Sequence, residues 1–414
     1  MSHMSGRSEV DNQKIVIFGA GKIGRSFIGQ LFGCGGYQVV FIDINQTIVD
    51  GLNQKGSYRV VIKGEKEEEI TVPNVQAISA LEKEKVIEAV STAGILAVSV
   101  GKNILEAIIP VIAAGLELRN SKNKGIPLDI ILAENMRSAA DFMREHLMKK
   151  LPAGFPLDTL VGLVETSIGK MVPIIPLAEL EKDPLVVFAE PYNTLILDSK
   201  GFISTIPKIK GLAPKSNIKA WVDRKAFIHN LGHATAAYYG YALHKEAVYL
   251  YEVLEDNEVL SFTRSVMLQS AEIVRAAYPG EFTITELKDH IDELIHRFRN
   301  KSLGDTIFRV GHDLIRKLGP DDRFMGSIHY ARQYQVPYDL ILKAMSYGLR
   351  FRAKDEEGNS FPSDSLFLES LEKDFESTLT GLLDYNKMLD LQVIEELARL
   401  YRQSGMLTEE GLLL

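Results

Sequence analysis

The feature that most constrains this fold is a glycine-rich turn between an apolar strand and a helix near the N-terminus. The β-branched run "KIVIF" (14–18) leads directly into "GAGKIGRSFIG", which places Gly19, Gly21 and Gly24 in a G-x-G-x-x-G pattern. The first glycine permits a tight turn, the second lets the backbone approach a pyrophosphate, and the third allows close helix packing. The free N–H groups at the helix start bind the anion. The pattern predicts a β-α-β unit that holds a dinucleotide.

The next segments of the chain repeat the same alternation of short apolar strands and amphipathic helices. Apolar strands separated by helices indicate a parallel sheet covered on both faces. We therefore predict an α/β protein whose N-terminal domain is a Rossmann-type doubly wound sheet. The charged segment "YRVVIKGEKEEEITV" (58–72) is typical of an inserted hairpin. The predicted strands lie at 14–18, 37–42, 95–100 and 128–135, and the predicted helices at 22–33 and 103–118.

Asp43 is the expected partner of the glycine turn. It ends "YQVVFID", about 20 residues after the turn, where a carboxylate accepts hydrogen bonds from both ribose hydroxyls. The same carboxylate repels a 2′-phosphate, so we expect NAD rather than NADP, although Lys22 and Arg25 lie nearby. A dinucleotide-binding regulator without turnover is an alternative at this point. The expected cofactor-binding residues are Gly19, Ala20, Gly21, Ile23, Gly24 and Asp43.

The second half of the chain has a different texture. After about residue 205, "STIPKIKGLAPKSN" carries loop signals, and the remainder of the chain has a helical period of 3.6. We predict two domains, an NAD-binding domain at 14–205 and an all-α substrate and catalytic domain at 206–414. The predicted helices are 218–243, 256–277, 284–297, 324–334, 337–350, 366–383 and 389–402.

The composition excludes several classes of protein. With 46% hydrophobic and 25% charged residues and a net charge of −8, the chain has no basic surplus for nucleic acid. It has no apolar run of the roughly 20 residues that span a bilayer and no signal-peptide core at its start, so we expect a cytoplasmic protein. Cys34 is the only cysteine, which excludes an internal disulfide and a thiolate-rich zinc site, and we expect no metal.

One helix, "RKAFIHNLGHATAAYYGY" (224–241), sets polar residues among apolar ones. Burial of Lys225 would lower its pKa from about 10.4 towards neutrality and make it a proton acceptor for an alcohol. In an α-helix, Asn230 lies about 140° and His233 about 80° around the axis from Lys225, so His233 shares its face and Asn230 sits at the margin. Taken alone, the same residues also fit a surface lysine and a hydrogen-bonded core histidine.

The spacing K-x4-N-x2-H after a dinucleotide-binding domain resembles the polyol-specific long-chain dehydrogenase/reductase family, also called the mannitol dehydrogenase family. The segments "FGAGKIGRSFIG", "FIDIN", "ILAENM", "NKSLGDTIFRVGHDLIRKL" and "DDR" are similar to its short members, from residue 14 to beyond 350. The resemblance implies NAD-dependent, metal-independent hydride transfer. It also implies Lys225 as general acid/base, Asn230 and Asn135 as oxyanion donors, and His233 as the group that orients substrate.

The resemblance to the short members further implies a phosphorylated substrate, with interconversion of D-mannitol 1-phosphate and D-fructose 6-phosphate by a monomer whose active site lies between the domains. Three positions depart from the family: Gly169 and Lys170 in "IGKMVP" replace an aspartate and an arginine, and His312 replaces an arginine. A hexuronate reductase acting on tagaturonate or fructuronate, a free-polyol 2-dehydrogenase and a non-catalytic NAD-binding regulator are the alternatives. The basic residues with the charge to hold a phosphate, or to form ion pairs instead, are Lys170, Arg309, Arg316, Lys317 and Arg323.

A competing motif lies in the same helix. Tyr241 and Lys245 form Y-x-x-x-K, the catalytic pair of short-chain dehydrogenases. Those enzymes have the glycine spacing G-x-x-x-G-x-G and carry the pair within a single domain of about 250 residues. We interpret the match as chance.

Overall fold

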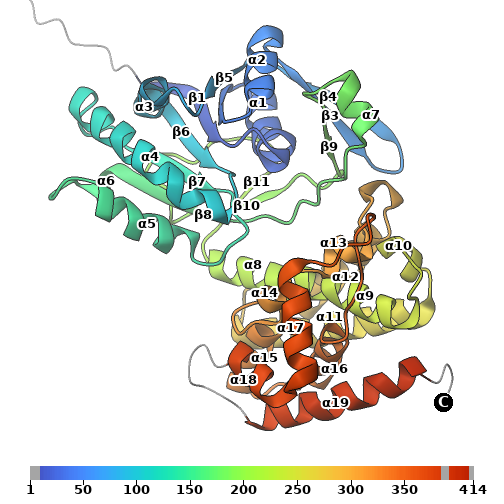
Figure 1. Cartoon of the computed structure of the whole chain (residues 1–414). Helices are drawn as coiled ribbons and strands as arrows, with labels where there is room; N and C mark the ends of the chain where they lie inside the picture. The colour runs from blue at the N-terminus through green and yellow to red at the C-terminus, as the bar shows by residue number, and fades with distance from the viewer. Residues whose placement is uncertain (1–9, 384–390, 410–414) are drawn as a thin grey trace, which may run out of the picture. The chain divides into compact units, whose positions relative to one another are not determined.

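The computed structural model describes residues 10–383 and 391–409, and the chain divides into two compact units between Val222 and Asp223 (Figure 1). The boundary expected from the sequence, between residues 205 and 206, precedes this division. The reason is that β11 (Leu212–Lys215) still pairs with β10 (Leu195–Asp198) in the sheet of the first unit.

The first unit is built on an eight-stranded sheet in the order β11-β10-β8-β7-β6-β1-β2-β5. Strand β1 lies between β2 and β6, with Ile15 opposite Val39 and Ile17 opposite Ala97, and both pairings are parallel. Only the pairing of β10 with β8 is antiparallel among the described strands of this sheet. The remaining strands are β1 (Asp11–Phe18), β2 (Gln38–Asp43), β5 (Val75–Ser79), β6 (Ala93–Val98), β7 (Leu128–Leu132) and β8 (Val161–Ser167).

Helices cover both faces of this sheet. Successive side chains of a strand point to opposite faces, so a continuous apolar run needs a cover on each face. Ile15 and Ile17 belong to the core under η1, α1 and α2, whereas Val16 and Phe18 belong to the core under α3, α4 and α5. Figure 1 shows the two sets of helices on opposite sides of the strands. The predicted doubly wound fold is confirmed. The helices are η1 (Gly24–Gly29), α1 (Gln30–Cys34), α2 (Gln46–Lys55), α3 (Lys83–Thr92), α4 (Lys102–Lys122), α5 (Ala139–Lys150), α6 (Leu157–Leu160) and α7 (Leu177–Lys182).

The predicted hairpin is also present. Strands β3 (Tyr58–Lys63) and β4 (Glu67–Val72) pair antiparallel, and β9 (Val187–Ala189) adds a third, parallel strand. The side chains of Tyr58 and Val60 pack in the same hydrophobic core as those of η1, so the inserted hairpin helps to hold the helix that follows the glycine turn.

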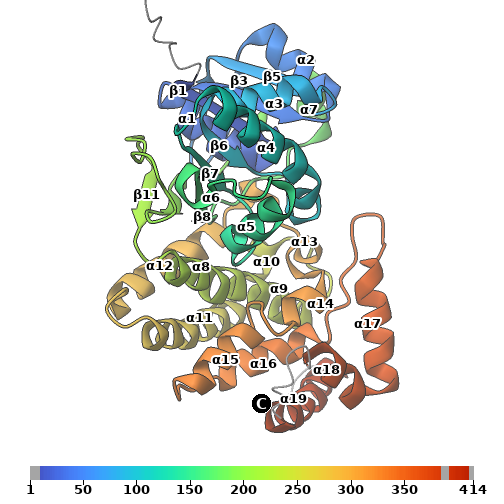
Figure 2. The same cartoon turned by 90° about the vertical axis from the view of Figure 1, so that its left-hand side faces the viewer.

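Helices and the loops that connect them make up the described residues of the second unit, apart from an isolated β-bridge between Tyr249 and Thr306. Helix α9 is apolar all round and contacts α10, α11, α13 and α16, as expected for a buried helix. Figure 2 shows α9 and α11 running side by side. The helices are α8 (Ile218–Arg224), which crosses the division, η2 (Lys225–Asn230), α9 (Leu231–Leu243), α10 (Leu250–Val253), α11 (Asn257–Ala277), α12 (Ile284–Phe298), η3 (Lys301–Leu303), α13 (Ile307–Gly311), α14 (Leu314–Leu318), α15 (Met325–Gln333), α16 (Asp339–Gly348), α17 (Pro362–Lys373), α18 (Phe375–Leu383) and α19 (Leu391–Glu409).

One predicted helix is wrong in its continuity. The span 366–383 is two helices, α17 and α18, because Asp374 between them has an extended backbone with φ −149° and ψ 92°. The first two residues of the predicted helix 389–402 lie outside the described residues, and α19 covers the rest.

Candidate active site

The three glycines of the N-terminal turn have three different surroundings. Gly19 has φ +96°, and a Cβ there would lie 2.6 Å from the carbonyl oxygen of Ser99. A Cβ at Gly24 would collide with the carbonyl oxygen of Gly19. A Cβ at Gly21 would meet nothing within 4 Å. Gly19 and Gly24 are therefore required by the fold itself, whereas Gly21 borders open space of the kind that a pyrophosphate needs.

Asp43 is held against this turn at the end of β2. Its Oδ2 accepts a hydrogen bond from the backbone N–H of Ala20 at 2.7 Å, and its Oδ1 accepts one from Asn45 at 2.9 Å. Ile23 packs against the core at the start of the helix. The carboxylate thus lies beside the turn, where the lone pairs that remain can accept ribose hydroxyls.

Arg25 is not placed to read a 2′-phosphate. Its side chain is buried, with Nε donating to the carbonyl of Ala20 and Nη1 to that of Leu185, both at 2.6 Å. Lys22 is exposed. Of the two basic residues near the turn, only Lys22 therefore faces solvent.

Two short helices that carry candidate residues, η1 with Gly24 and η2 with Lys225 and Asn230, are π-helical, with hydrogen bonds between residues i and i+5. In each, a hydroxyl group from another element donates to a carbonyl of the wide turn. The Tyr58 hydroxyl donates to Arg25 at 2.7 Å, and the Ser270 hydroxyl donates to Phe227 at 2.6 Å. Segments of this kind occur frequently at functional sites, and here tertiary contacts stabilise them.

The π-helix corrects the expected geometry of Lys225 and Asn230. The predicted angle of about 140° between them rests on 100° per residue, which applies to an α-helix. Because η2 has more residues per turn than an α-helix, the angle between Asn230 and Lys225 is smaller than the predicted 140°. The α-helical value therefore does not apply to this pair.

The ammonium group of Lys225 has a strongly altered acidity. Burial, with a further contribution from the nearby Arg323, lowers its pKa from 10.5 to about 7. A lysine with this pKa exchanges a proton readily at neutral pH, as a general acid/base requires.

Arg323 also holds the end of η2. Its Nη1 donates to the backbone carbonyl of Asn230 at 3.2 Å, and its Nε donates to Asp322 at 2.8 Å. The residue is 6% exposed, so its charge is poorly screened by water. One buried residue therefore both fixes the backbone of Asn230 and helps keep Lys225 neutral.

His233 lies in the first turn of α9 against a buried carboxylate. Its Nε2 is 3.1 Å from Oδ2 of Asp305, an ion-pair separation without the alignment of a hydrogen bond. Asp305 also pairs with Arg309. The imidazole stacks on Phe298 with ring centroids 4.6 Å apart. Burial, and then Arg309, hold the pKa of His233 well below its usual range, so the ring is neutral at pH 7.

Asn135 belongs to the first unit. It is exposed and comes after the carboxyl end of β7, where ligands of parallel sheets collect. Its neighbour Glu134 is buried and accepts hydrogen bonds from the backbone of Val100 at 2.8 Å and of Gly101 at 3.1 Å. Glu134 therefore joins the loop after β7 to the loop after β6 and supports the position of Asn135.

Lys170, one of the departures from the family pattern, is a buried structural residue. Its Nζ donates to Oδ1 of Asn193 at 2.7 Å and lies 5.1 Å from the centroid of the Phe27 ring. Gly169 beside it has room, because a Cβ there would meet its nearest neighbour, Tyr192, at 3.6 Å. These partners favour a structural role for Lys170 over the binding of a phosphate, and packing does not force a glycine at 169.

The other basic residues considered for a phosphate also have partners inside the helical unit. Lys317 donates to two backbone carbonyls, at Val310 (2.7 Å) and at His312. The remaining contacts are Arg309 with Asp305, Arg316 with Asp313 and Asp322, and Arg323 with Asp322. The three arginines are therefore paired with carboxylates, and Lys317 is held by backbone carbonyls.

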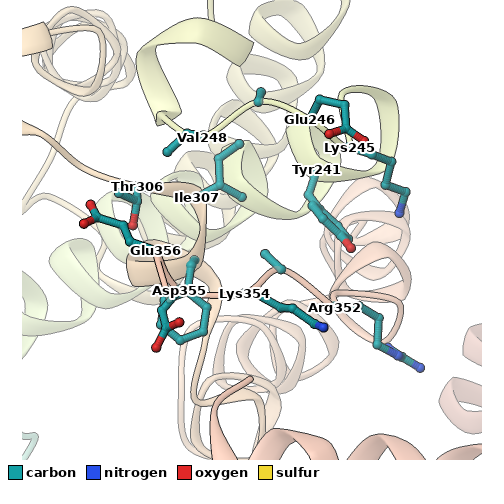
Figure 3. Close-up of a pocket in the computed structure, with 13 residues that line it drawn as sticks. Tyr241, Lys245, Glu246, Val248, Thr306, Ile307, Arg352, Lys354, Asp355 and Glu356 are labelled. Carbon is teal, nitrogen blue, oxygen red and sulfur yellow. The ribbon is translucent and has the colours of Figure 1, made fainter. Parts of the chain in front are cut away.

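The Tyr241 and Lys245 pair lines a pocket of the helical unit (Figure 3). The Lys245 Nζ lies 4.0 Å from the centroid of the Tyr241 ring. Burial raises the pKa of Tyr241, which is the opposite of what a tyrosine base needs at neutral pH. Since the pair also lies outside the dinucleotide-type sheet, the geometry agrees with interpreting this motif as chance.

Sequence reasoning missed Asp305, Glu134 and Ser270. Ser270 carried a signal, because it is a polar residue on the buried face of the amphipathic helix α11. Asp305 and Glu134 carried none beyond their place in the family segments, since their partners lie far away in the chain.

Among residues 10–383 and 391–409, no three His, Cys, Asp or Glu side chains cluster as a metal site would require. Within the same residues, no helix is long and apolar enough to cross a membrane.

The fold and the two groups of residues define a Rossmann-type unit with a glycine turn and a helical unit with a half-buried lysine, an asparagine and a histidine. The mannitol dehydrogenase Rossmann domain matches residues 13–211, and the mannitol dehydrogenase C-terminal domain matches residues 217–395. The chain therefore belongs to the mannitol dehydrogenase family.

Similar proteins agree with this membership. Mannitol-1-phosphate 5-dehydrogenases of Geobacillus stearothermophilus and Geobacillus thermodenitrificans (strain NG80-2) are each 36% identical, over 83% and 84% of this chain and 88% of their own lengths. A D-sorbitol dehydrogenase in substrate-free form has a TM-score of 0.77 at 17% identity, over 95% of this chain and 94% of its own. Pseudomonas fluorescens mannitol 2-dehydrogenase, in a ternary complex with NAD and D-mannitol, has a TM-score of 0.73 at 16% identity, over 95% and 92%.

Proposed function

We propose that this protein is an NAD-dependent dehydrogenase that interconverts D-mannitol 1-phosphate and D-fructose 6-phosphate. The substrate assignment rests on the two Geobacillus relatives, which bear the name of that activity. The chemical assignment rests on one observation, a half-buried Lys225 whose pKa is lowered to about 7 in the K-x4-N-x2-H motif of the family.

The residues of the glycine turn fit NAD as the cofactor. The open space at Gly21 suits a pyrophosphate, Asp43 suits the ribose hydroxyls, and the buried Arg25 offers nothing to a 2′-phosphate. NAD, when bound, accepts the hydride from the substrate carbon during oxidation.

Lys225 would move the proton. Its neutral amine accepts the proton of the substrate hydroxyl at Nζ during oxidation, and the ammonium form returns that proton to the carbonyl oxygen during reduction. Asn230 and Asn135 are the proposed donors to the same oxygen as it gains negative charge. The neutral imidazole of His233 is the proposed group that orients a substrate hydroxyl.

A direct spectrophotometric assay tests the proposal. We would mix the protein with NADH and, in turn, fructose 6-phosphate, fructose, tagaturonate and fructuronate, and monitor the nicotinamide absorbance. Turnover of fructose 6-phosphate in preference to the others supports the proposal. Preference for tagaturonate or fructuronate would instead indicate a hexuronate reductase. Preference for fructose would indicate a free-polyol dehydrogenase. Binding of NADH without turnover of any of the four sugars would indicate a regulator.

A matched pair of variants checks that Lys225 carries the chemistry. Lys225→Met should abolish turnover while the affinity for NADH stays within about threefold of wild type. Lys288→Met, which removes an exposed lysine of α12, should leave both unchanged.

A further inference from the structure

The helical unit contains a pocket that none of the proposed catalytic residues lines. Its volume is about 610 Å³, within the range of roughly 300–1,000 Å³ typical of small-molecule sites. The end of α9 and the loop after it, the start of α13 and the loop 352–356 form its walls (Figure 3).

Three cations lie on one side of this pocket, and we call Lys245, Arg352 and Lys354 the cationic wall. Figure 3 shows them on the same side, with the Tyr241 side chain between Lys245 and Lys354. Arg352 is anchored, because its Nη1 donates to the carbonyl of Leu349 at 3.1 Å and its Nη2 pairs with Glu372 at 3.0 Å.

The two lysines of the cationic wall have no ion pair with any described residue. Lys245 contacts the face of the Tyr241 ring, and Lys354 makes no hydrogen bond within the same described part of the chain. Burial, and then Arg352 and Arg350, lower the pKa of Lys245. Glu246 also lines the pocket, as do Asp355 and Glu356 on its other side, so the positive charge is local to the cationic wall. A bound anion would relieve the mutual repulsion of these cations.

The opposite side of the pocket offers oxygen atoms. We call Thr306, Asp355 and Glu356 the acceptor wall, and Figure 3 shows them together, away from Lys245 and Arg352. Asp355 is held by its own turn, since its Oδ1 accepts hydrogen bonds from the backbone of Glu357 at 3.0 Å and of Asn359 at 2.7 Å. Carboxylates in this position accept hydrogen bonds from hydroxyl groups and repel a second anion.

We propose that this pocket binds a phosphorylated sugar or sugar alcohol, with its phosphate on the cationic wall and its hydroxyl groups toward the acceptor wall. A phosphate monoester carries about two negative charges, and lysine and arginine are its usual partners in proteins. The inference goes beyond the proposed function, because it concerns binding at residues separate from those assigned to proton transfer.

Calorimetry without a nicotinamide cofactor tests the proposal. The probes are fructose 6-phosphate, inorganic phosphate and fructose, titrated into the full chain. The test protein carries Lys245→Gln and Lys354→Gln together. The control carries Lys288→Gln and Lys373→Gln, which remove two exposed lysines of α12 and α17 and change the net charge equally.

We expect wild type and control to bind fructose 6-phosphate, with inorganic phosphate competing and fructose binding at least tenfold more weakly. The test variant should lose at least tenfold in affinity at one site. If its KM for fructose 6-phosphate rises equally at constant kcat, the pocket holds the phosphate of the substrate itself; if KM is unchanged, it holds a separate effector. Affinity of the test variant within twofold of wild type would overturn the proposal, as would a wild type that binds neither phosphate compound. Since calorimetry needs no turnover, a failure of the proposed reaction would be seen separately.

Discussion

Replacing Lys225 by methionine should increase stability in a pH-dependent way, because the native state places an ammonium group where water is scarce. The pKa of Lys225 falls from 10.5 to about 7 on folding. At 1.36 kcal/mol for each unit, that difference corresponds to about 5 kcal/mol of destabilisation of the charged form. Methionine has a similar length and no charge, so it removes this cost while filling most of the same space.

The direction of the pH dependence is set by proton uptake. Below pH 7 the lysine is protonated in both the folded and the unfolded state, and the folded state carries the full cost. Between about pH 7 and 10.5 the unfolded state binds a proton that the folded state has released, so the free energy of unfolding rises with pH. The advantage of Lys225→Met should therefore be greatest at pH 6 and shrink toward pH 9.

Urea unfolding of both proteins at pH 6, 7.5 and 9 measures this difference. We expect Lys225→Met to be more stable than wild type by about 2–4 kcal/mol at pH 6. This is less than the full cost of the buried charge, because the variant also loses the native contacts that the lysine made. The same titration should appear in catalysis. For wild type, kcat/KM for polyol oxidation should rise with pH through about 7, whereas that for ketose reduction should fall.

Two results would refute the reasoning. A stability difference between wild type and Lys225→Met that is constant from pH 6 to 9 would mean that Lys225 does not titrate differently in the folded state. Substantial turnover by Lys225→Met would mean that another group transfers the proton. Lys288→Met serves as the control and should show no pH-dependent difference from wild type.

Five further variants test other parts of the structure. Gly21→Ala should fold normally, because its Cβ enters open space, but should bind NADH at least tenfold more weakly in a fluorescence titration, because that space is where the pyrophosphate would lie. Gly24→Ala should lower the thermal midpoint, because its Cβ collides with the carbonyl oxygen of Gly19. Equal stability of the two variants would contradict this assignment. Asn230→Ala should lower kcat about 100-fold or more with little change in NADH affinity, and a loss confined to KM would exclude a role as oxyanion donor. Asp305→Asn should lower kcat about tenfold in wild type but add little in a His233→Ala background, since it acts through that ring; fully additive losses would show that it does not. Ser270→Ala should lower the free energy of unfolding in urea by about 1–3 kcal/mol, because the Phe227 carbonyl loses its hydrogen-bond partner. It should also lower kcat, because η2 carries Lys225 and Asn230. An unchanged kcat would show that the π-helix does not depend on Ser270.

The sequence by itself determined the main strands and helices and the residue types of the site. Apolar strands alternating with helices predicted the doubly wound sheet, because burial on both faces requires continuous apolar runs. The glycine pattern and Asp43 predicted a nucleotide turn, since the conformation of Gly19 and the packing of Gly24 are local requirements. The spacing of Lys225, Asn230 and His233 was equally local.

Only the tertiary structure decided how those residues are set relative to one another and to their surroundings. The hydroxyl of Ser270 donates to the Phe227 carbonyl inside the π-helix η2, and no property of 225–230 alone specifies that bond. Likewise, Asp305 reaches His233 because hydrogen bonds from Leu250 to the Asp305 carbonyl (2.9 Å) and from Ile307 to the Val248 carbonyl (2.8 Å) hold its backbone beside α9. Local propensity determines which helix forms, but the side chains that surround a buried charge come from distant segments. The acidity of Lys225 is therefore a property of the folded unit.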